Sequence, residues 1–207
     1  MSDAVKRDSA GILSARDGYV LRLARAEDAE AYWRNFDPLD PDVARLTGCK
    51  PVFSRDEVVG FFMDCLEDDS RRDFLILAPD GSVVGESVIN EIDPGLRCAN
   101  YRVALFRPEV RGRGLGLWAV CAVRDYAFSV LKLHRLSLDV FSVNPRAERV
   151  YRAAGFRREG VLRDAVRIDG NYADDVLMSI LEDEWRRIRS AAPELPLNRG
   201  ADRTEGI

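Results

Sequence analysis

The sequence is poor in the side chains that most often bind metals or act as catalytic imidazoles. It holds a single histidine, His134, in 207 residues. A His-rich metal site needs several imidazoles, so the sequence excludes one, together with any Ser-His-Asp triad that does not use His134. His134 stands at the head of an apolar strand pattern, which favours a structural role over a catalytic one. We therefore expect no bound metal.

Paired cysteines and long apolar runs are also absent. The four cysteines are widely separated and form no C-x-x-C motif, which argues against a zinc site or a disulfide framework: Cys49, Cys65, Cys98 and Cys121. No apolar run approaches the roughly 20 residues that a membrane-spanning helix needs, and the segment from Met1 to Asp17 is charged rather than signal-like. These absences predict a cytoplasmic protein with reduced thiols and no membrane partner.

The charge balance is slightly acidic. The chain has 31 Lys and Arg residues against 35 Asp and Glu residues, which gives a formal net charge of -4. This balance weighs against a nucleic-acid partner and is neutral toward small cationic substrates. With 46% hydrophobic residues, the chain can bury one sizeable core. We expect a flexible arm over residues 1–17, one domain over 18–189 and a disordered tail over 190–207.

The apolar periodicity predicts alternating strands and helices. The expected order is one strand, two helices, three strands, a helix, a strand, a helix and two strands, with the segment from Asp37 to Pro51 as a loop. This order indicates an α/β (α+β) domain with a mixed, mostly antiparallel sheet flanked by helices. The expected strands cover residues 19–23, 74–78, 83–92, 101–106, 134–141, 156–168 and 172–181, and the helices cover 25–36, 54–67, 115–131 and 144–154.

A glycine-rich loop lies between the strand pattern 101–106 and the long helical pattern after it. Glycine permits close approach of a ligand, and the unpaired N–H groups at a helix N-terminus attract anions. Two arginines in the loop add cationic donors for phosphate oxygens. The loop therefore predicts a site for a phosphorylated cofactor, and its residues are Arg111, Gly112, Arg113, Gly114, Leu115 and Gly116.

The loop sequence also fits two other interpretations. It could be a plain connection with solvated arginines. The spacing Gly114-x-Gly116-x-x-Ala119, with Asp139 downstream, also fits a dinucleotide-binding fingerprint. That fingerprint should follow its strand at once, whereas the segment from Arg107 to Arg111 intervenes, and no further βαβ units follow Asp139. The dinucleotide interpretation is therefore the weaker one, and no Walker motif occurs.

Four segments of the sequence resemble motifs of the GNAT superfamily of acetyl-CoA-dependent N-acetyltransferases. The loop resembles the family's pyrophosphate loop, and the segment from Asn144 to Phe156 resembles its second cofactor motif. The end of the chain resembles the branch of ribosomal-protein N-terminal (RimJ/RimL-like) and polyamine acetyltransferases. The resemblance covers roughly Tyr19 to Trp185. The motifs are Arg111-x-x-Gly114-x-Gly116, Asn144-x-x-Ala147-x-x-x-Tyr151-x-x-x-Gly155-Phe156, Arg158-Glu159-Gly160-x-Leu162-Arg163-Asp164 and Gly170-x-Tyr172-x-Asp174.

The resemblance implies acetyl-CoA as the cosubstrate. Backbone N–H groups of the loop would hold the pyrophosphate, and main-chain groups at Leu105 and Phe106 would hold the pantetheine and the thioester carbonyl. In the family this strand is splayed from its neighbour, which frees those groups. Asn144 is expected to cap a helix and, through it, to contact the cofactor.

The resemblance also implies catalytic residues. Tyr151 is the candidate acid for the departing thiolate, although its helix face also fits a core tyrosine. The base is less well defined, because Glu86, Glu91 and Asp93 all lie on or next to the strand 83–92. In a regular strand Glu86 and Glu91 face opposite sides. Glu91 is favoured because the expected hairpin register puts it nearer the cofactor end of the central strand.

The acceptor follows from the protonation of amines. Near pH 7 about one α-amino group in six is neutral, against fewer than about one lysine-like amine in a thousand. Without a convincing base, the sequence favours a protein or peptide N-terminal α-amine. The alternatives are a small-molecule amine, such as a polyamine or an antibiotic-like amine, and a non-catalytic acyl-CoA-binding sensor. A monomer and a homodimer are both left open.

Overall fold

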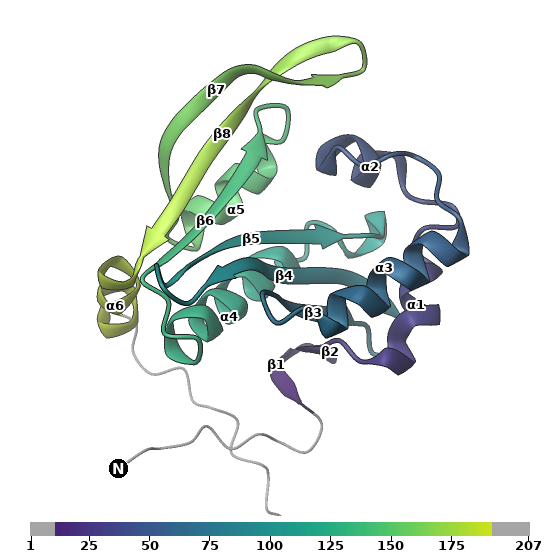
Figure 1. Ribbon diagram of the computed structural model, residues 1–207, viewed down its shortest axis with the longest axis horizontal. Coiled ribbons are helices and arrows are strands. Elements are labelled where there is room, and N and C mark those ends of the chain that lie inside the picture. The colour runs from purple at the N-terminus through teal and green to yellow at the C-terminus, as the bar shows by residue number, and fades with distance from the viewer. Residues whose placement is uncertain (1–10, 192–207) are drawn as a thin grey trace, which may run out of the picture.

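An eight-stranded sheet forms the centre of the computed structural model, which describes residues 11–191 (Figure 1). The strand order is β1-β2-β3-β4-β5-β6-β8-β7, and every neighbouring pair is antiparallel except β5 and β6. The mixed, mostly antiparallel sheet is therefore confirmed. The strands are β1 (Ile12–Arg16), β2 (Tyr19–Leu23), β3 (Arg72–Leu77), β4 (Val83–Asp93), β5 (Cys98–Leu105), β6 (Arg135–Phe141), β7 (Arg157–Ile168) and β8 (Asn171–Leu181).

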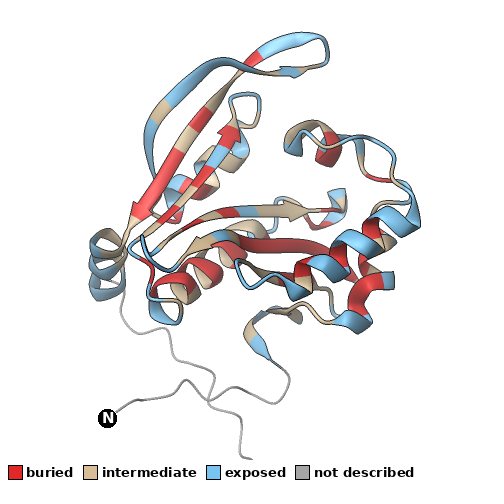
Figure 2. Cartoon of the chain, in the orientation of Figure 1, coloured by how far each residue is buried: buried red, intermediate tan, exposed pale blue. Residues whose placement is uncertain are grey.

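Helices cover both faces of this sheet. On one face α4 (Leu115–Ser129) and α5 (Pro145–Ala153) pack over the larger core, and on the other face α1 (Ala29–Trp33), α2 (Pro41–Thr47) and α3 (Arg55–Glu67) enclose a second core. Strand β4 lies between the two cores, and Figure 2 shows most of it as buried. The remaining helical segments are η1 (Ala26–Asp28), η2 (Pro108–Val110) and α6 (Glu182–Ala191).

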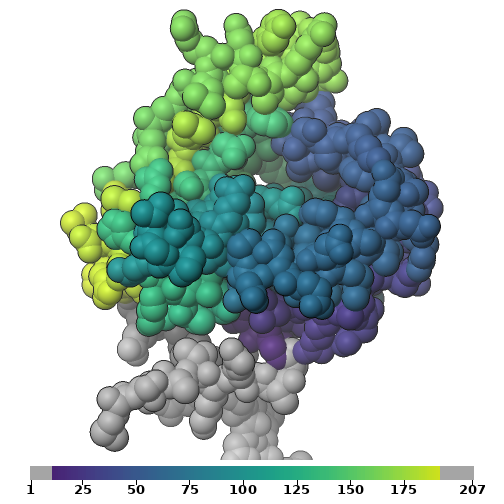
Figure 3. Space-filling model, in the orientation of Figure 1, coloured from purple at the N-terminus to yellow at the C-terminus, as the bar shows by residue number. Residues whose placement is uncertain are grey.

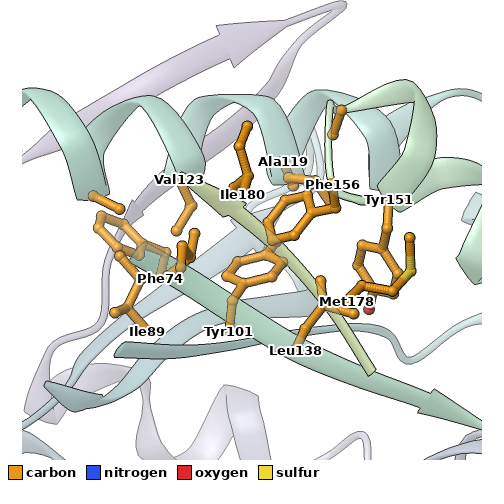
Figure 4. Close-up of a cluster of buried hydrophobic side chains, with 14 of the residues drawn as sticks. Phe74, Ile89, Tyr101, Ala119, Val123, Leu138, Tyr151, Phe156, Met178 and Ile180 are labelled. Carbon is orange, nitrogen blue, oxygen red and sulfur yellow. The ribbon is translucent and has the colours of Figure 1, made fainter. Parts of the chain in front are cut away.

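The larger core joins α4 and α5 to the middle of the sheet. Val123 of α4 lies above Phe74 of the sheet and Ala119 of α4 lies beside Phe156, and all four are buried (Figure 4). Small and β-branched residues on α4 allow the helix to approach the strands closely, which favours dense packing. This core holds the helix that follows the glycine-rich loop in a fixed position against the strand that precedes it.

The parallel pair β5 and β6 stays together for only three residues. Its register joins Cys98 to Arg135, Ala99 to Leu136 and Asn100 to Ser137, whereas β5 continues to Leu105. Beyond Asn100 the two strands diverge, and Figure 1 shows β6, β8 and β7 leaning away from β5. The splay that the family resemblance implies is therefore present. We call the opening between β5 and β6 the fork.

The N-terminal half of the chain departs from the expected element bounds. Residues 12–16 of the expected arm form β1, which pairs with β2, while residues 1–10 lie outside the described part of the chain. The expected loop from Asp37 to Pro51 contains α2, which Asp40 caps by accepting a hydrogen bond from the Val43 amide. The signal was present, because Asp followed by Pro is a typical N-cap and first helical position. The expected helix 25–36 is shorter, as η1 followed by α1.

The C-terminal part follows the prediction more closely. Asn144 caps α5, Gly155 follows its end with φ +96°, and β7 and β8 form the expected hairpin. The one missed element is α6, which follows β8 directly and extends to Ala191. It therefore reaches past the expected domain boundary at residue 189, and residues 192–207 of the expected tail lie outside the described part.

Candidate functional site

The glycine-rich loop ends at the open N-terminus of α4. Gly112 and Gly114 have φ values of +80° and +78°, which favour glycine because other residues rarely adopt them. The first helical hydrogen bond runs from the Trp118 amide to the Gly114 carbonyl (3.0 Å), and no side chain caps the helix. The amides of residues 115–117 therefore have no acceptor within the helix. This is the geometry that the pyrophosphate prediction requires.

The two loop arginines have different surroundings. The Arg111 guanidinium donates hydrogen bonds to the Leu105 carbonyl (3.2 Å) and to Asp40 (2.7 Å), and only 18% of the side chain is exposed. Its predicted role as a phosphate donor is therefore wrong for the side chain, because Arg111 is occupied in joining the loop to β5 and α2. Arg113 is exposed and available to a ligand.

Two further arginines lie at the loop that the sequence did not indicate. The Arg16 guanidinium donates to the Gly114 carbonyl (3.2 Å), and the Arg146 guanidinium lies beside Gly112. Arg16 belongs to β1, in the segment predicted as a flexible arm, so no local signal connected it with the loop. Together with Arg113 they make the surroundings of the loop cationic, which suits a phosphate.

The main chain of β5 presents donors to the fork. The Phe106 amide donates to the Val84 carbonyl (2.9 Å), so the predicted cofactor contact through the Phe106 N–H group is wrong. In an antiparallel pair the amides point alternately toward and away from the partner strand. Because Phe106 points toward β4, Leu105 and Val103 point away from it, into the fork where β6 has already diverged. The Leu105 prediction is consistent with this geometry, and Val103 was missed.

Tyr151 reaches the same fork from the opposite side. Its ring comes from α5, is 5% exposed and contacts Phe156, with centroids 6.0 Å apart. Figure 4 shows it pointing from the helix toward the sheet beside Leu138 and Met178. Its hydroxyl makes no hydrogen bond to any residue in the range 11–191. Burial, with a smaller contribution from Asp139, raises the pKa of Tyr151 above its ordinary value, so the hydroxyl stays protonated.

Asn144 acts as the helix cap that the sequence predicts. Its side-chain oxygen accepts a hydrogen bond from the Ala147 amide (3.1 Å), which fixes the first turn of α5. Because Tyr151 lies on that helix, Asn144 helps to set the position of the Tyr151 ring. We retain the cofactor contact of Asn144 as an indirect one, made through α5.

The carboxylates of β4 occupy positions that alternation did not predict. Glu91 sits in a register irregularity between Asn90 and Asp93, has φ +54° and is exposed. It lies near the end of β4 that is opposite Cys98, far along the strand from Leu105, so the positional reason for choosing it as the base is wrong. Asp93 accepts a hydrogen bond from the Leu96 amide and stabilises a turn.

Glu86 is the carboxylate of β4 that lies at the level of the fork. It is opposite Ala104 of β5 and is 7% exposed. It accepts a hydrogen bond from the Tyr32 hydroxyl (2.8 Å) and pairs with Arg102 (3.3 Å). Burial and the Glu86 charge raise the pKa of Tyr32, which keeps Tyr32 as the donor. Glu86 therefore lies on the sheet face that α1 and α3 cover.

A cavity of about 190 Å³ opens at the point where β5 and β6 separate. Its polar lining includes Asn100, Ser137 and Asp139, with the ion pair of Arg135 and Glu159 at one end. Figure 3 shows the surface hollowed on this side, between the green β7–β8 arm and the blue helix α2. The lining also includes Leu138 and Met178, beside which Tyr151 lies (Figure 4), and the free amides of β5 are on the neighbouring strand. Together these groups suit acyl transfer.

Other expected features lie elsewhere. His134 is exposed just before β6, with its backbone bonded to Arg97 and Glu182. The four cysteines are free thiols. Within residues 11–191 no three His, Cys, Asp or Glu side chains are arranged to hold a metal ion, and no helix is both long and apolar enough to cross a membrane.

Comparison with known proteins gives this arrangement a family context. The family model for the acetyltransferase (GNAT) domain matches residues 19–157. The spermidine N(1)-acetyltransferase of Vibrio cholerae is 29% identical over 136 residues, which cover 66% of this chain and 78% of that protein. The spermidine N(1)-acetyltransferase of Escherichia coli K12 is 33% identical over 120 residues, which cover 58% of this chain and 63% of that protein, less than two thirds of its length.

A solved structure matches the fold over nearly its whole length. The spermidine N-acetyltransferase from Vibrio cholerae, in complex with CoA and spermine, superposes with a TM-score of 0.74 at 25% sequence identity. The match covers 83% of this chain and 99% of that structure. Sequence family and fold therefore agree.

Proposed function

Because this chain belongs to the GNAT family of acetyl-CoA-dependent N-acetyltransferases, we propose that its acceptor is a polyamine such as spermidine. The protein is an acyltransferase, and acetyl-CoA is its cosubstrate. The relatives named above favour the small-molecule alternative over the N-terminal α-amine that the sequence suggested. The observation that carries the site assignment is the unpaired hydroxyl of Tyr151, whose ring is buried beside the fork.

Different parts of the chain would bind different parts of acetyl-CoA. The free amides at the start of α4, with Arg16, Arg113 and Arg146 around them, would hold the pyrophosphate. The amides of Val103 and Leu105 would hold the pantetheine and donate to the thioester oxygen as it gains charge. Arg111 keeps this assembly in place by joining the loop to β5 and to Asp40.

Tyr151 would donate a hydrogen bond or a proton to the departing thiolate. At ordinary values, near 10 for tyrosine and 8.5 for a thiol, full transfer costs about 2 kcal/mol. Burial raises the pKa of Tyr151. The same apolar surroundings would disfavour a thiolate, so the pKa of the thiol would rise together with that of Tyr151. The cost therefore stays small beside an enzymatic barrier.

A polyamine needs a carboxylate to take its proton, because fewer than about one such amine in a thousand is neutral near pH 7. We assign this role to Glu86, which lies at the level of the fork, rather than to Glu91. Glu86→Gln should lower kcat about tenfold or more, while Glu91→Gln should leave kcat unchanged. Equal effects of the two substitutions would remove Glu86 as the base.

The acceptor is tested by steady-state kinetics with labelled acetyl-CoA and a panel of amines. We expect kcat/KM for spermidine at pH 7.5 to exceed that for a peptide with a small free N-terminal residue by about tenfold or more. A peptide preference would overturn the polyamine proposal and restore the α-amine alternative. Binding of acetyl-CoA without transfer to any amine would instead indicate a non-catalytic sensor.

A further inference from the structure

The face of β6 and β8 that borders the fork carries two carboxylates without a counter-ion. Asp139 lies on β6 and lines the cavity, and Asp175 lies on β8. The register pairs Asp139 with Leu177 and Phe141 with Asp175, so the two aspartates are diagonal neighbours on one face. Among residues 11–191, neither forms an ion pair.

This lack of counter-ions is unusual for the chain. Its other partly buried carboxylates near the site have partners: Asp40 pairs with Arg111, Asp73 with Arg71 and Glu86 with Arg102. The Oδ1 atom of Asp175, by contrast, is buried and has no hydrogen-bond partner in the described chain. A buried acceptor without a donor costs free energy, so Asp175 is open to a donor that a ligand would bring.

A second orphan oxygen lies on β4, the strand on the far side of β5 from the fork. The Oδ1 atom of Asn90 on β4 is also buried without a partner, and Asn90 is opposite Asn100, which lines the cavity. Both orphan atoms are hydrogen-bond acceptors, and Asp139 adds two more acceptor oxygens. An alkylammonium group offers three N–H donors, a positive charge and no acceptor. This face of the sheet is therefore rich in acceptors without donors, which matches a protonated amine.

We propose that Asp139 and Asp175 bind a protonated amine of the acceptor that is not the amine being acetylated, so that the enzyme selects substrates with at least two amines. This inference rests on the proposed function and deepens it. Glu86 lies on β4 on one side of the fork, and the aspartates lie on β6 and β8 on the other. One amine could therefore lose its proton on the β4 side while another remains charged on the aspartate side.

The burial of Asp175 and its proximity to Asp139 agree with this role. Burial, followed by the Asp139 charge, raises the pKa of Asp175. Two carboxylates held near each other without a cation repel, and an ammonium group that bridges them would remove that repulsion.

The proposal is tested with two substrates that differ by one ammonium group, putrescine and n-butylamine. For the wild-type enzyme, kcat/KM for putrescine should exceed that for butylamine by about tenfold to a hundredfold, the range expected for a charge-assisted contact. Asp139→Asn and Asp175→Asn keep the side-chain shape and should raise KM for putrescine and spermidine by about tenfold each, with kcat changed less than about threefold. Neither substitution should change kcat/KM for butylamine.

Glu91→Gln is the matched control, because it removes one exposed negative charge outside the fork. It should leave the diamine preference intact. Thermal unfolding separates recognition from a structural role: removing two unpaired carboxylates should leave Tm unchanged or raise it, whereas a structural role would lower Tm. An unchanged diamine preference in both aspartate variants would overturn the proposal, and so would an equal loss of kcat with every amine.

The proposal can also be separated from the assignment of the reaction. If the wild-type enzyme acetylates no amine, spermine is titrated by calorimetry into the protein saturated with CoA. Binding by the wild type and at least tenfold weaker binding by Asp139→Asn and Asp175→Asn would support the ammonium site while the proposed function fails. Equal affinity in all three proteins, or no binding to the wild type, would overturn the ammonium site itself.

Discussion

Tyr151→Phe separates a catalytic tyrosine from a core tyrosine. The substitution removes one oxygen and keeps the ring contacts with Tyr101 and Phe156. Since the hydroxyl has no partner among residues 11–191, we expect the free energy of unfolding to change by less than about 0.5 kcal/mol. If the hydroxyl serves the departing thiolate, kcat should fall about a hundredfold, which corresponds to about 2.7 kcal/mol of transition-state stabilisation.

Tyr101→Phe provides the matched control in the same core. Its ring is 2% exposed, but its hydroxyl lies 2.7 Å from Ser87 Oγ. This substitution should cost about 1 kcal/mol of stability and change kcat less than about threefold. The two variants therefore predict opposite patterns, activity lost with stability kept for Tyr151 and the reverse for Tyr101.

The assay is kcat with spermidine under saturating acetyl-CoA, combined with urea unfolding and calorimetric CoA affinity. Because burial raises the pKa of Tyr151, the hydroxyl stays protonated and the ratio of wild-type to variant kcat should stay constant from pH 7 to 9. Wild-type turnover in Tyr151→Phe would refute the reasoning. A loss of activity matched by an equal loss of stability would refute it too.

Three further predictions concern the loop and the packing around it. In Gly116→Ala the new Cβ would lie 3.9 Å from Leu105 Cδ1, so the substitution should fit and stabilise helix α4 by up to about 1 kcal/mol. The affinity for CoA, measured by calorimetry, should nevertheless fall at least tenfold, and an unchanged affinity would contradict the loop assignment. Burial tends to raise the pKa of Asp40, but the hydrogen bonds from Arg111 and the Val43 amide lower it overall. The charged Asp40 carboxylate therefore stabilises the folded protein above about pH 4, and this stabilisation is lost as the pH falls through the pKa of Asp40 in the folded state. Urea unfolding should show Asp40→Asn less stable by about 1–2 kcal/mol at pH 6 and the gap closing below pH 4, and a constant gap would count against the ion pair. Burial raises the pKa of the Cys65 thiol to about 11, so iodoacetamide at pH 8 should label Cys65 at least tenfold more slowly in folded than in unfolded protein, and equal rates would show that the thiol is accessible.

Local signals in the sequence predicted the features that depend on neighbouring residues. The Asn144 cap and the glycine-rich loop each form through contacts a few residues apart, and the structure contains both. The Tyr151 position followed from a motif on one short helix. Such features are visible because helix ends and turns select particular side chains.

Features that depend on distant residues could not be predicted in this way. Arg111 was expected to face phosphate, but its partner Asp40 lies 71 residues earlier in a segment taken for a loop. Glu91 was favoured because the expected hairpin register put it nearer the cofactor end of the central strand, but the observed register puts it near the opposite end, beside Asp93 and Cys98. The proposed ammonium site uses Asp139 of β6 and Asp175 of β8, and only the pairing of these two strands brings the aspartates together.

A crystal structure of the complex with CoA tests the central claim most directly. The account predicts the pyrophosphate against the amides of residues 112–117 and the pantetheine alongside Val103 and Leu105 at the fork. The thiol sulfur should lie within about 3.5 Å of the Tyr151 hydroxyl. A CoA molecule bound away from the fork, or one whose sulfur lies beyond reach of Tyr151, would contradict the account.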